Sequence, residues 1–83
     1  MDVKVLGTGC AKCTKLYAHA EKAIAEAGVH ASLAKVERID EIMKFGVMMT
    51  PALVIDGELK CLGRIPQVAE IISWLTASAA KNG

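Results

Sequence analysis

The segment Val3-Lys4-Val5-Leu6-Gly7-Thr8-Gly9-Cys10-Ala11-Lys12-Cys13 decides how this chain begins to fold. A short apolar run is followed by a hinge that contains two glycines, and the hinge is followed by two cysteines separated by two residues. An alanine-rich segment with helical periodicity comes next. The pattern predicts a strand that leads into a helix, with the cysteine pair at the start of that helix. Such a pair can close into a disulfide and open again, so redox chemistry is the first functional hypothesis.

The size and charge of the chain narrow the possible classes of protein. Its 83 residues suffice for one core, which predicts a single domain over 1–83. More than half of the residues are apolar, the net charge is +1, and basic and acidic residues alternate along the chain. This composition argues against nucleic acid and anionic membranes as partners. We expect a monomer.

The expected location follows from the absence of targeting patterns. No stretch approaches the roughly 18 consecutive apolar residues of a membrane span. Met1-Asp2-Val3-Lys4 begins directly in a strand-like pattern, without the hydrophobic core of a signal peptide. Three cysteines with one close pair suit a reducing compartment. The sequence therefore predicts a cytoplasmic protein without a membrane partner.

The rest of the chain alternates between predicted strands and helices. Helical spacing extends over 11–27, a weaker apolar pattern over 30–36 predicts a strand parallel to the first, and a short helix begins near Ile39 and ends before Gly46. Asp56-Gly57 between two apolar runs predicts an antiparallel hairpin. A last helix follows Pro66, and the tail 77–83 is expected to fray. The predicted fold is α/β, with the order β-α-β-α-β-β-α and a four-stranded mixed sheet flanked by three helices.

The two cysteines are predicted to differ in reactivity. Cys10 lies at a helix start, where unpaired N–H groups and the helix dipole favour a thiolate, and the neighbouring cation Lys12 adds to this effect. Cys13 precedes Leu16 by three residues, which places it on the helix face that turns toward the core. We therefore expect Cys10 to be the nucleophile and Cys13 the resolving thiol. Unreactive packing of both thiols is the plainest alternative.

A metal site is a further alternative for the same residues. The loop resembles the Gly-x-x-Cys-x-x-Cys loop of heavy-metal-associated domains, and two thiolates suit Cu(I). Those domains end on a strand, whereas this chain is predicted to end on a helix. Structural zinc requires four ligands, and the chain offers no second pair at suitable spacing. We therefore expect no metal and no cofactor, with a soft-metal carrier as the rival function.

Met49-Thr50-Pro51 completes a recognisable set of motifs. Thr-Pro before an apolar run, together with the CxxC motif after the first strand, the Asp56-Gly57 hairpin and Gly63-Arg64-Ile65-Pro66 before the last helix, resembles the small thioredoxin-like or glutaredoxin-like proteins of the redox-active disulfide protein 2 type. The resemblance extends over nearly the whole chain. It implies a compact thioredoxin-like fold and a thiol-disulfide oxidoreductase.

The resemblance also implies roles for residues and partners. Pro51 is expected to be cis and close to Cys10, and the Thr50 backbone to pair with an extended substrate segment beside Met49. The partners would be a protein that contains a disulfide and a thiol or flavoprotein reductase. A domain that keeps the dithiol but acts only as a redox-controlled interaction partner is a third possible function.

The sequence departs from thioredoxins at three positions near the cysteines. Gly9 replaces an aromatic residue, and Ala11-Lys12 replaces Gly-Pro, so both positions are expected to tune the docking surface and the potential. Lys4 occupies the position, six residues before Cys10, at which thioredoxins hold a buried acid. The resolving thiol is therefore expected to use water or another group for its proton.

Several other side chains receive structural expectations only. Cys61 is expected to be a buried small hydrophobe, His19 to lie on the solvated face of its helix, and Trp74 to be half-buried. Met48 and Met49 are candidates for either core packing or an adaptable docking patch around the dithiol.

Overall fold

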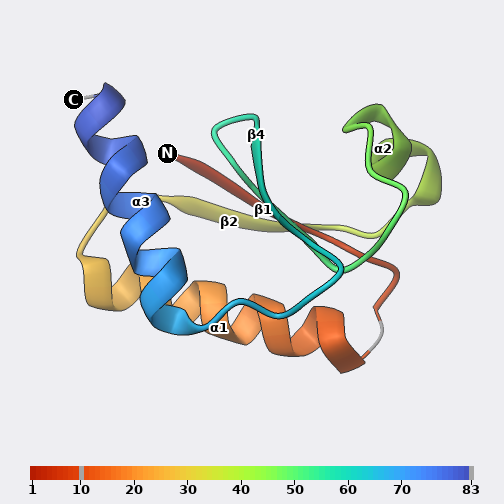
Figure 1. Ribbon diagram of the computed structural model, residues 1–83, viewed down its shortest axis with the longest axis horizontal. Coiled ribbons are helices and arrows are strands. Elements are labelled where there is room, and N and C mark those ends of the chain that lie inside the picture. The colour runs from red at the N-terminus through yellow and green to blue at the C-terminus, as the bar shows by residue number, and fades with distance from the viewer. Residues whose placement is uncertain (10, 83) are drawn as a thin grey trace.

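The structure of the chain, a computed structural model, describes residues 1–9 and 11–82. Within this part, the elements follow the predicted order: β1 (Asp2–Leu6), α1 (Ala11–Ala27), β2 (Ser32–Val36), α2 (Ile39–Lys44), β3 (Ala52–Ile55), β4 (Glu58–Leu62) and α3 (Val68–Asn82). The strands form one four-stranded sheet in the order β2-β1-β3-β4 (Figure 1). The predicted α/β class, mixed sheet and three helices are confirmed. The second strand begins two residues later than the predicted 30–36.

The pairing of the strands brings three loops to one end of the sheet. β1 and β2 are parallel, with Leu6 opposite Val36, and β1 and β3 are antiparallel, with Leu6 opposite Ala52. Consequently the loop after β1, the loop after β2 and the loop before β3 all lie at the same end of the sheet. The backbone N–H of Gly7 donates to the carbonyl of Val36 at 2.9 Å and extends the parallel pairing into this region.

The two faces of the sheet carry separate cores because successive side chains of a strand point to opposite faces. α1 and α3 lie together on one face (Figure 1), and α2 belongs to the other. The larger core joins α1 and α3 to the sheet and contains Val3, Val5, Leu16, Ala20, Ala23, Leu53, Ile55, Cys61, Ile71 and Leu75. The smaller core contains Leu6, Val36, Ile42, Val47, Ala52 and Val54.

The buried side of α1 explains how it packs so closely. Its buried residues are Cys13, Leu16, Ala20 and Ala23, which recur at helical spacing. The two alanines add little bulk, so α1 can pack closely against Ile71 and Leu75 of α3 in the same cluster. Among the described residues, no helix is both long enough and apolar enough to cross a membrane.

The C-terminal helix is longer than the sequence predicts. The tail was expected to fray from Ala77 onward, but α3 continues to Asn82. Asp56 provides one reason: one of its carboxylate oxygens accepts the hydroxyl of Ser78 at 2.6 Å, and the other accepts the backbone N–H of Asp2 at 2.8 Å. Lys81 also pairs with Glu58 at 3.5 Å. The last turns of α3 are thus joined to the hairpin, which simple composition rules do not anticipate.

Candidate functional site

Cys13 lies in the first turns of α1, with its side chain turned toward the sheet. It is 5% exposed, as expected for the buried member of the pair. Lys12, the preceding residue, is exposed. Cys10, the predicted nucleophile, lies outside the described residues, so its predicted role stays a prediction.

Gly7 allows Cys13 to approach the end of β1. A Cβ atom built at Gly7 would overlap the Cys13 Sγ atom and would lie 3.0 Å from the Cys13 Cβ and 3.9 Å from the Thr50 Cβ. A larger residue would fit at this position only if the Cys13 side chain moved. The structure therefore brings together Cys13 and Thr50, two predicted site residues that are far apart in the sequence.

The residues of the loop before β3 differ in how much of each is exposed to solvent. The peptide bond between Thr50 and Pro51 is cis. Pro51 is buried and its carbonyl accepts the backbone N–H of Gly63 at 2.8 Å, whereas Thr50 is exposed. Met49 is 57% exposed and lies over Gly63, because a Cβ atom built at Gly63 would come within 2.9 Å of the Met49 Cε. Of these residues, Met49 and Thr50 have side chains that solvent reaches.

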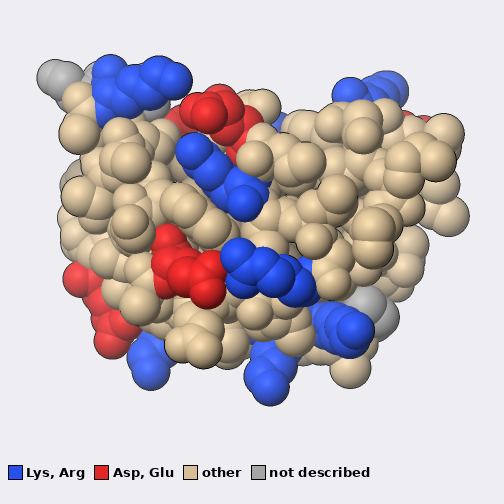
Figure 2. Space-filling view, viewed as in Figure 1, with Lys and Arg blue, Asp and Glu red and all other residues tan. Residues whose placement is uncertain are grey.

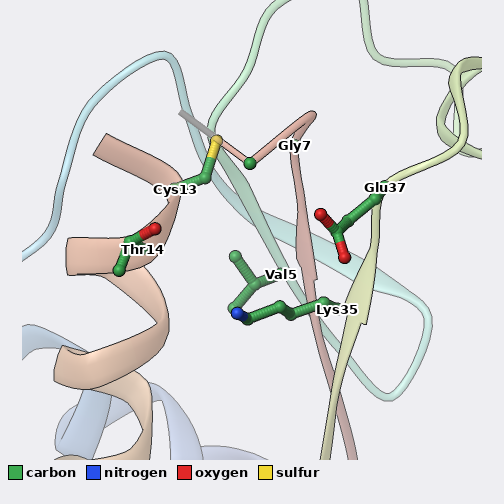
Figure 3. Close-up of a pocket in the computed structure, with 7 residues that line it drawn as sticks. Val5, Gly7, Cys13, Thr14, Lys35 and Glu37 are labelled. Carbon is green, nitrogen blue, oxygen red and sulfur yellow. The ribbon is translucent and has the colours of Figure 1, made fainter. Parts of the chain in front are cut away.

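A small cavity separates Cys13 from the end of β2 (Figure 3). Its volume is about 10 Å³, and Val5, Gly7, Gly9, Cys13, Thr14, Lys35 and Glu37 line it. Figure 3 shows Cys13 on one side of this space and the Glu37 carboxylate on the other. The Lys35 Nζ atom lies 4.8 Å from the centre of the Tyr17 ring, a cation–π distance.

Lys4 faces away from this cavity. It points to the α2 side of the sheet, where its Nζ atom lies 5.4 Å from the centre of the Phe45 ring and 3.1 Å from the Asp2 carboxylate. The β1 residue that lines the Cys13 cavity is Val5. Counting six residues back from Cys10 therefore identifies a position on the other face of the sheet, because strand residues alternate.

An apolar groove lies beside the loops on the α2 side. Its volume is about 340 Å³, and it is lined by Thr8, Ile39, Ile42, Met43, Val47, Met48 and Thr50. Met48 is 91% exposed, which settles the choice between core and surface for this residue. In the space-filling view, uncharged residues cover most of the region around α2 on the right (Figure 2). The groove is open to solvent and shares Thr8 and Thr50 with the surroundings of the cysteine loop.

Comparison with known proteins agrees with this geometry. Residues 1–76 match the model of a family described as "Thioredoxin domain". The chain belongs to the thioredoxin domain family. It is 39% identical over 71 residues to a thioredoxin of Methanothermobacter thermautotrophicus. The aligned segment covers 86% of this chain and 92% of that protein. It is 38% identical over 69 residues to a thioredoxin of Methanocaldococcus jannaschii. The aligned segment covers 83% of this chain and 79% of that protein.

Family membership confirms the thioredoxin-like fold implied by the motifs. It places the chain among thioredoxin-type redox proteins, a class whose general activity is disulfide oxidoreduction. Within the described residues, no group of three or more His, Cys, Asp or Glu side chains is arranged to hold a metal ion.

In this thioredoxin-family chain, the structure tests the expected burial of three other side chains. Cys61 is buried, as expected, and its Sγ atom lies 3.6 Å from the carbonyl of Arg64. Trp74 is half-buried against the larger core, also as expected. The expectation for His19 is wrong: it is partly buried, and its Nδ1 atom lies 2.9 Å from the Pro66 carbonyl. This contact joins α1 to the loop that precedes α3.

The sequence reasoning missed the residues from β2 and α2. Lys35 and Glu37 reach the Cys13 cavity because β2 is parallel to β1 and ends at the same edge. The sequence predicted that β2 is parallel to β1. That pairing was the available indication that the residues at the end of β2 lie near the cysteine loop. Ile39 and Met43 were assigned only to a short helix, but both remain more than 60% exposed along the groove.

Proposed function

We propose that this chain is a thiol-disulfide oxidoreductase that acts on protein disulfides through Cys10 and Cys13. The observation that supports it best is the placement of Cys13, buried against Gly7 and next to the exposed Thr50, at the sheet edge of a thioredoxin-family chain. Cys10 lies three residues earlier, before the first residue of α1.

The proposed reaction conserves atoms and electrons over two exchanges. The Cys10 thiolate attacks one sulfur of the substrate disulfide, which forms a mixed disulfide and releases the first substrate thiolate. The Cys13 thiol then loses its proton and attacks the Cys10 sulfur. This step forms the Cys10–Cys13 disulfide and releases the second substrate thiolate. The substrate disulfide is thereby reduced by two electrons, and the protein dithiol is oxidised.

The surface beside the site supports a protein as the substrate. Thr50 is exposed near Cys13, in the position proposed for pairing with an extended segment. Met49, the preceding residue, is also exposed, and Pro51 is the buried residue of that loop. The adjoining groove is lined by Ile39, Met43 and Met48, among other residues, and flexible methionines can adapt to varied apolar side chains.

The remaining parts of the proposal concern the partners and the setting. A thiol or a flavoprotein reductase would return the Cys10–Cys13 disulfide to the dithiol. Lys12 and Gly9, which stand where other thioredoxins carry a proline and an aromatic residue, would tune the potential and the docking surface. We propose that the protein works in the cytoplasm as a monomer with one domain over 1–83.

Replacement of each cysteine tests this function. Cys10→Ser is expected to abolish reduction of insulin disulfides, because no nucleophile would remain at the helix start. Cys13→Ser is expected to trap substrates as mixed disulfides, which mass spectrometry of unreduced samples would detect. Cys61→Ala is the matched control and should keep the activity, since Cys61 lies in the core. Full activity of Cys10→Ser would refute the proposal.

The rival soft-metal carrier predicts a different result for the same thiols. Anaerobic titration with Cu(I), combined with measurement of the dithiol potential against glutathione buffers, separates the two functions. The proposal requires a reversible two-electron couple. Tight stoichiometric binding of Cu(I) without such a couple would favour the carrier.

A further inference from the structure

The burial of Cys13 poses a problem of proton transfer. The nucleophile in disulfide exchange is the thiolate, so the Cys13 thiol must lose its proton before or while it attacks. The residue is only 5% exposed, which limits direct transfer to bulk water. A group near the thiol must therefore accept the proton or pass it to solvent.

The cavity beside Cys13 offers such a route. Its volume of about 10 Å³ is close to the minimum that holds one water molecule. Three of the residues that line it besides Cys13 have polar or charged side chains, namely Thr14, Lys35 and Glu37. Glu37 itself is exposed, so it connects the cavity to solvent. Its carboxylate faces the space from the side opposite Cys13 (Figure 3).

The other charged groups nearby are less suited to accept a proton. The ammonium group of Lys35 has no acceptor site and is held over the Tyr17 ring. Arg38, the next residue after Glu37, pairs with Asp40 at 3.2 Å. Lys12 and Lys15 of α1 are exposed and do not line the cavity. Among the described residues that line it, Glu37 is the one carboxylate.

Gly9 leaves space for the Glu37 carboxylate beside the cysteine loop. A Cβ atom built at Gly9 would lie 3.2 Å from the Glu37 Oε2 atom, so the carboxylate would have to shift by a few tenths of an ångström. The φ angle of Gly9 is +85°, which most residues with a side chain avoid. The glycine that replaces the aromatic residue of other thioredoxins thus leaves room for Glu37 next to the cysteine loop.

We propose that Glu37 accepts the proton of the Cys13 thiol, directly or through one water molecule in the cavity, when Cys13 attacks the mixed disulfide. This inference rests on the proposed function, because it concerns the second exchange. The S–H bond of Cys13 breaks and the Glu37 carboxylate takes the proton. A new bond forms between the sulfurs of Cys13 and Cys10, the bond between the Cys10 sulfur and the substrate sulfur breaks, and the substrate leaves as a thiolate. Glu37 then returns the proton to solvent at its exposed side.

The test follows the second exchange separately from the first. Reaction with an aromatic disulfide such as dithiobis(nitrobenzoate) releases one coloured thiolate when Cys10 is modified and a second when Cys13 closes the protein disulfide. Stopped-flow absorbance resolves the two releases. Glu37→Gln removes the acceptor but keeps the shape of the side chain. Glu26→Gln is the matched control, because it makes the same change in net charge at the far end of α1, about 20 Å from Cys13.

We expect Glu37→Gln to slow the second release at least about tenfold near neutral pH, since positioned acid–base groups commonly contribute more than this. Its rate should also rise more steeply with pH than that of the wild type, because hydroxide or bulk water must then remove the proton. The first release and the Glu26→Gln variant should follow the wild type closely, and Glu37→Asp should recover part of the rate.

Other outcomes would overturn the inference. If Glu37 acted only as a nearby negative charge, its removal would favour the Cys13 thiolate and speed the second release. An unchanged rate, or an equal slowing at every pH, would likewise exclude a proton acceptor. If wild-type protein released no second thiolate at all, the proposed dithiol exchange itself would fail, which is a different result from any of these.

Discussion

The two faces of the sheet differ in how completely they are covered. On one face, α1 and α3 bury a continuous core that includes Leu53 with no exposed surface. On the other, the short helix α2 covers a smaller core through Ile42 and leaves Ile39 and Met43 largely exposed. In the space-filling view, most of the visible charged side chains lie to the left of and below the region of α2 (Figure 2).

Under the proposed function, the covered face provides stability and the open face provides the surface for recognition. The covered face carries most of the apolar burial, which is the main favourable contribution to folding. The open face can keep solvent-exposed apolar residues because the fold does not depend on burying them. A groove next to the cysteine loop is therefore available for a partner without weakening the core.

Truncation of one core residue on each face gives the largest expected effect. Leu53→Ala should lower the free energy of unfolding by about 4 kcal/mol, within the usual range for buried leucine. Ile42→Ala should lower it by about 2 kcal/mol, at the low end of that range, because α2 is short and can shift into the groove. Urea denaturation followed by circular dichroism measures both. Equal losses would show that the two faces contribute alike.

Replacement of an exposed groove residue should affect binding and leave stability nearly unchanged. Met48→Ser should change the free energy of unfolding by less than about 0.5 kcal/mol, since the side chain is on the surface. It should raise the KM for insulin disulfides but leave the reaction with a small aromatic disulfide unaltered. Leu59→Ser, at an exposed apolar residue of β4 outside the groove, is the control. An equal rise of KM in both variants would argue against docking in the groove.

The smallest effect is expected at an ion pair that lies at the start of α3. The Glu70 carboxylate lies 2.9 Å from Arg64, and the hydrogen bond from this guanidinium lowers the pKa of Glu70 below its ordinary value of 4.5. The pair therefore stabilises the fold at pH values above that ordinary value, and its contribution is lost as the pH falls through the lowered pKa. Because the pair is exposed, the change in stability should be small.

Carboxyl NMR titration checks this assignment. Arg64→Ala should raise the pKa of Glu70 toward 4.5. A pKa of Glu70 that is the same in both proteins would show that the contact with Arg64 does not persist in solution.

The sequence predicted the order of the elements because their signals are local. Apolar periodicity identified α1, and Asp56-Gly57 identified the hairpin between β3 and β4. The burial of Cys13 followed from its spacing to Leu16. These features depend on neighbours within one or two turns, which a single sequence displays directly.

The missed features depend on contacts between distant segments. Glu37 reaches the Cys13 cavity because β2 is parallel to β1 and ends beside it. The α2-side orientation of Lys4 becomes visible only once helices α1 and α2 are assigned to opposite faces of the sheet. The last turns of α3 are fixed by the hydrogen bond between Ser78 and Asp56. Helix propensity alone gave no sign of this bond, because it joins residues that are 22 positions apart.

The carboxylate of Asp56 also has a practical consequence for engineering. By accepting from Asp2 and Ser78, it holds the first strand and the last helix together, and Figure 1 shows the start of β1 and the last turn of α3 at the same corner of the molecule. The cysteine loop follows the other end of β1. A fluorescent reporter or a surface tether attached at either terminus would therefore leave the cysteine loop and the groove accessible, so the protein can be immobilised on an electrode or a bead with its reactive end facing the solution.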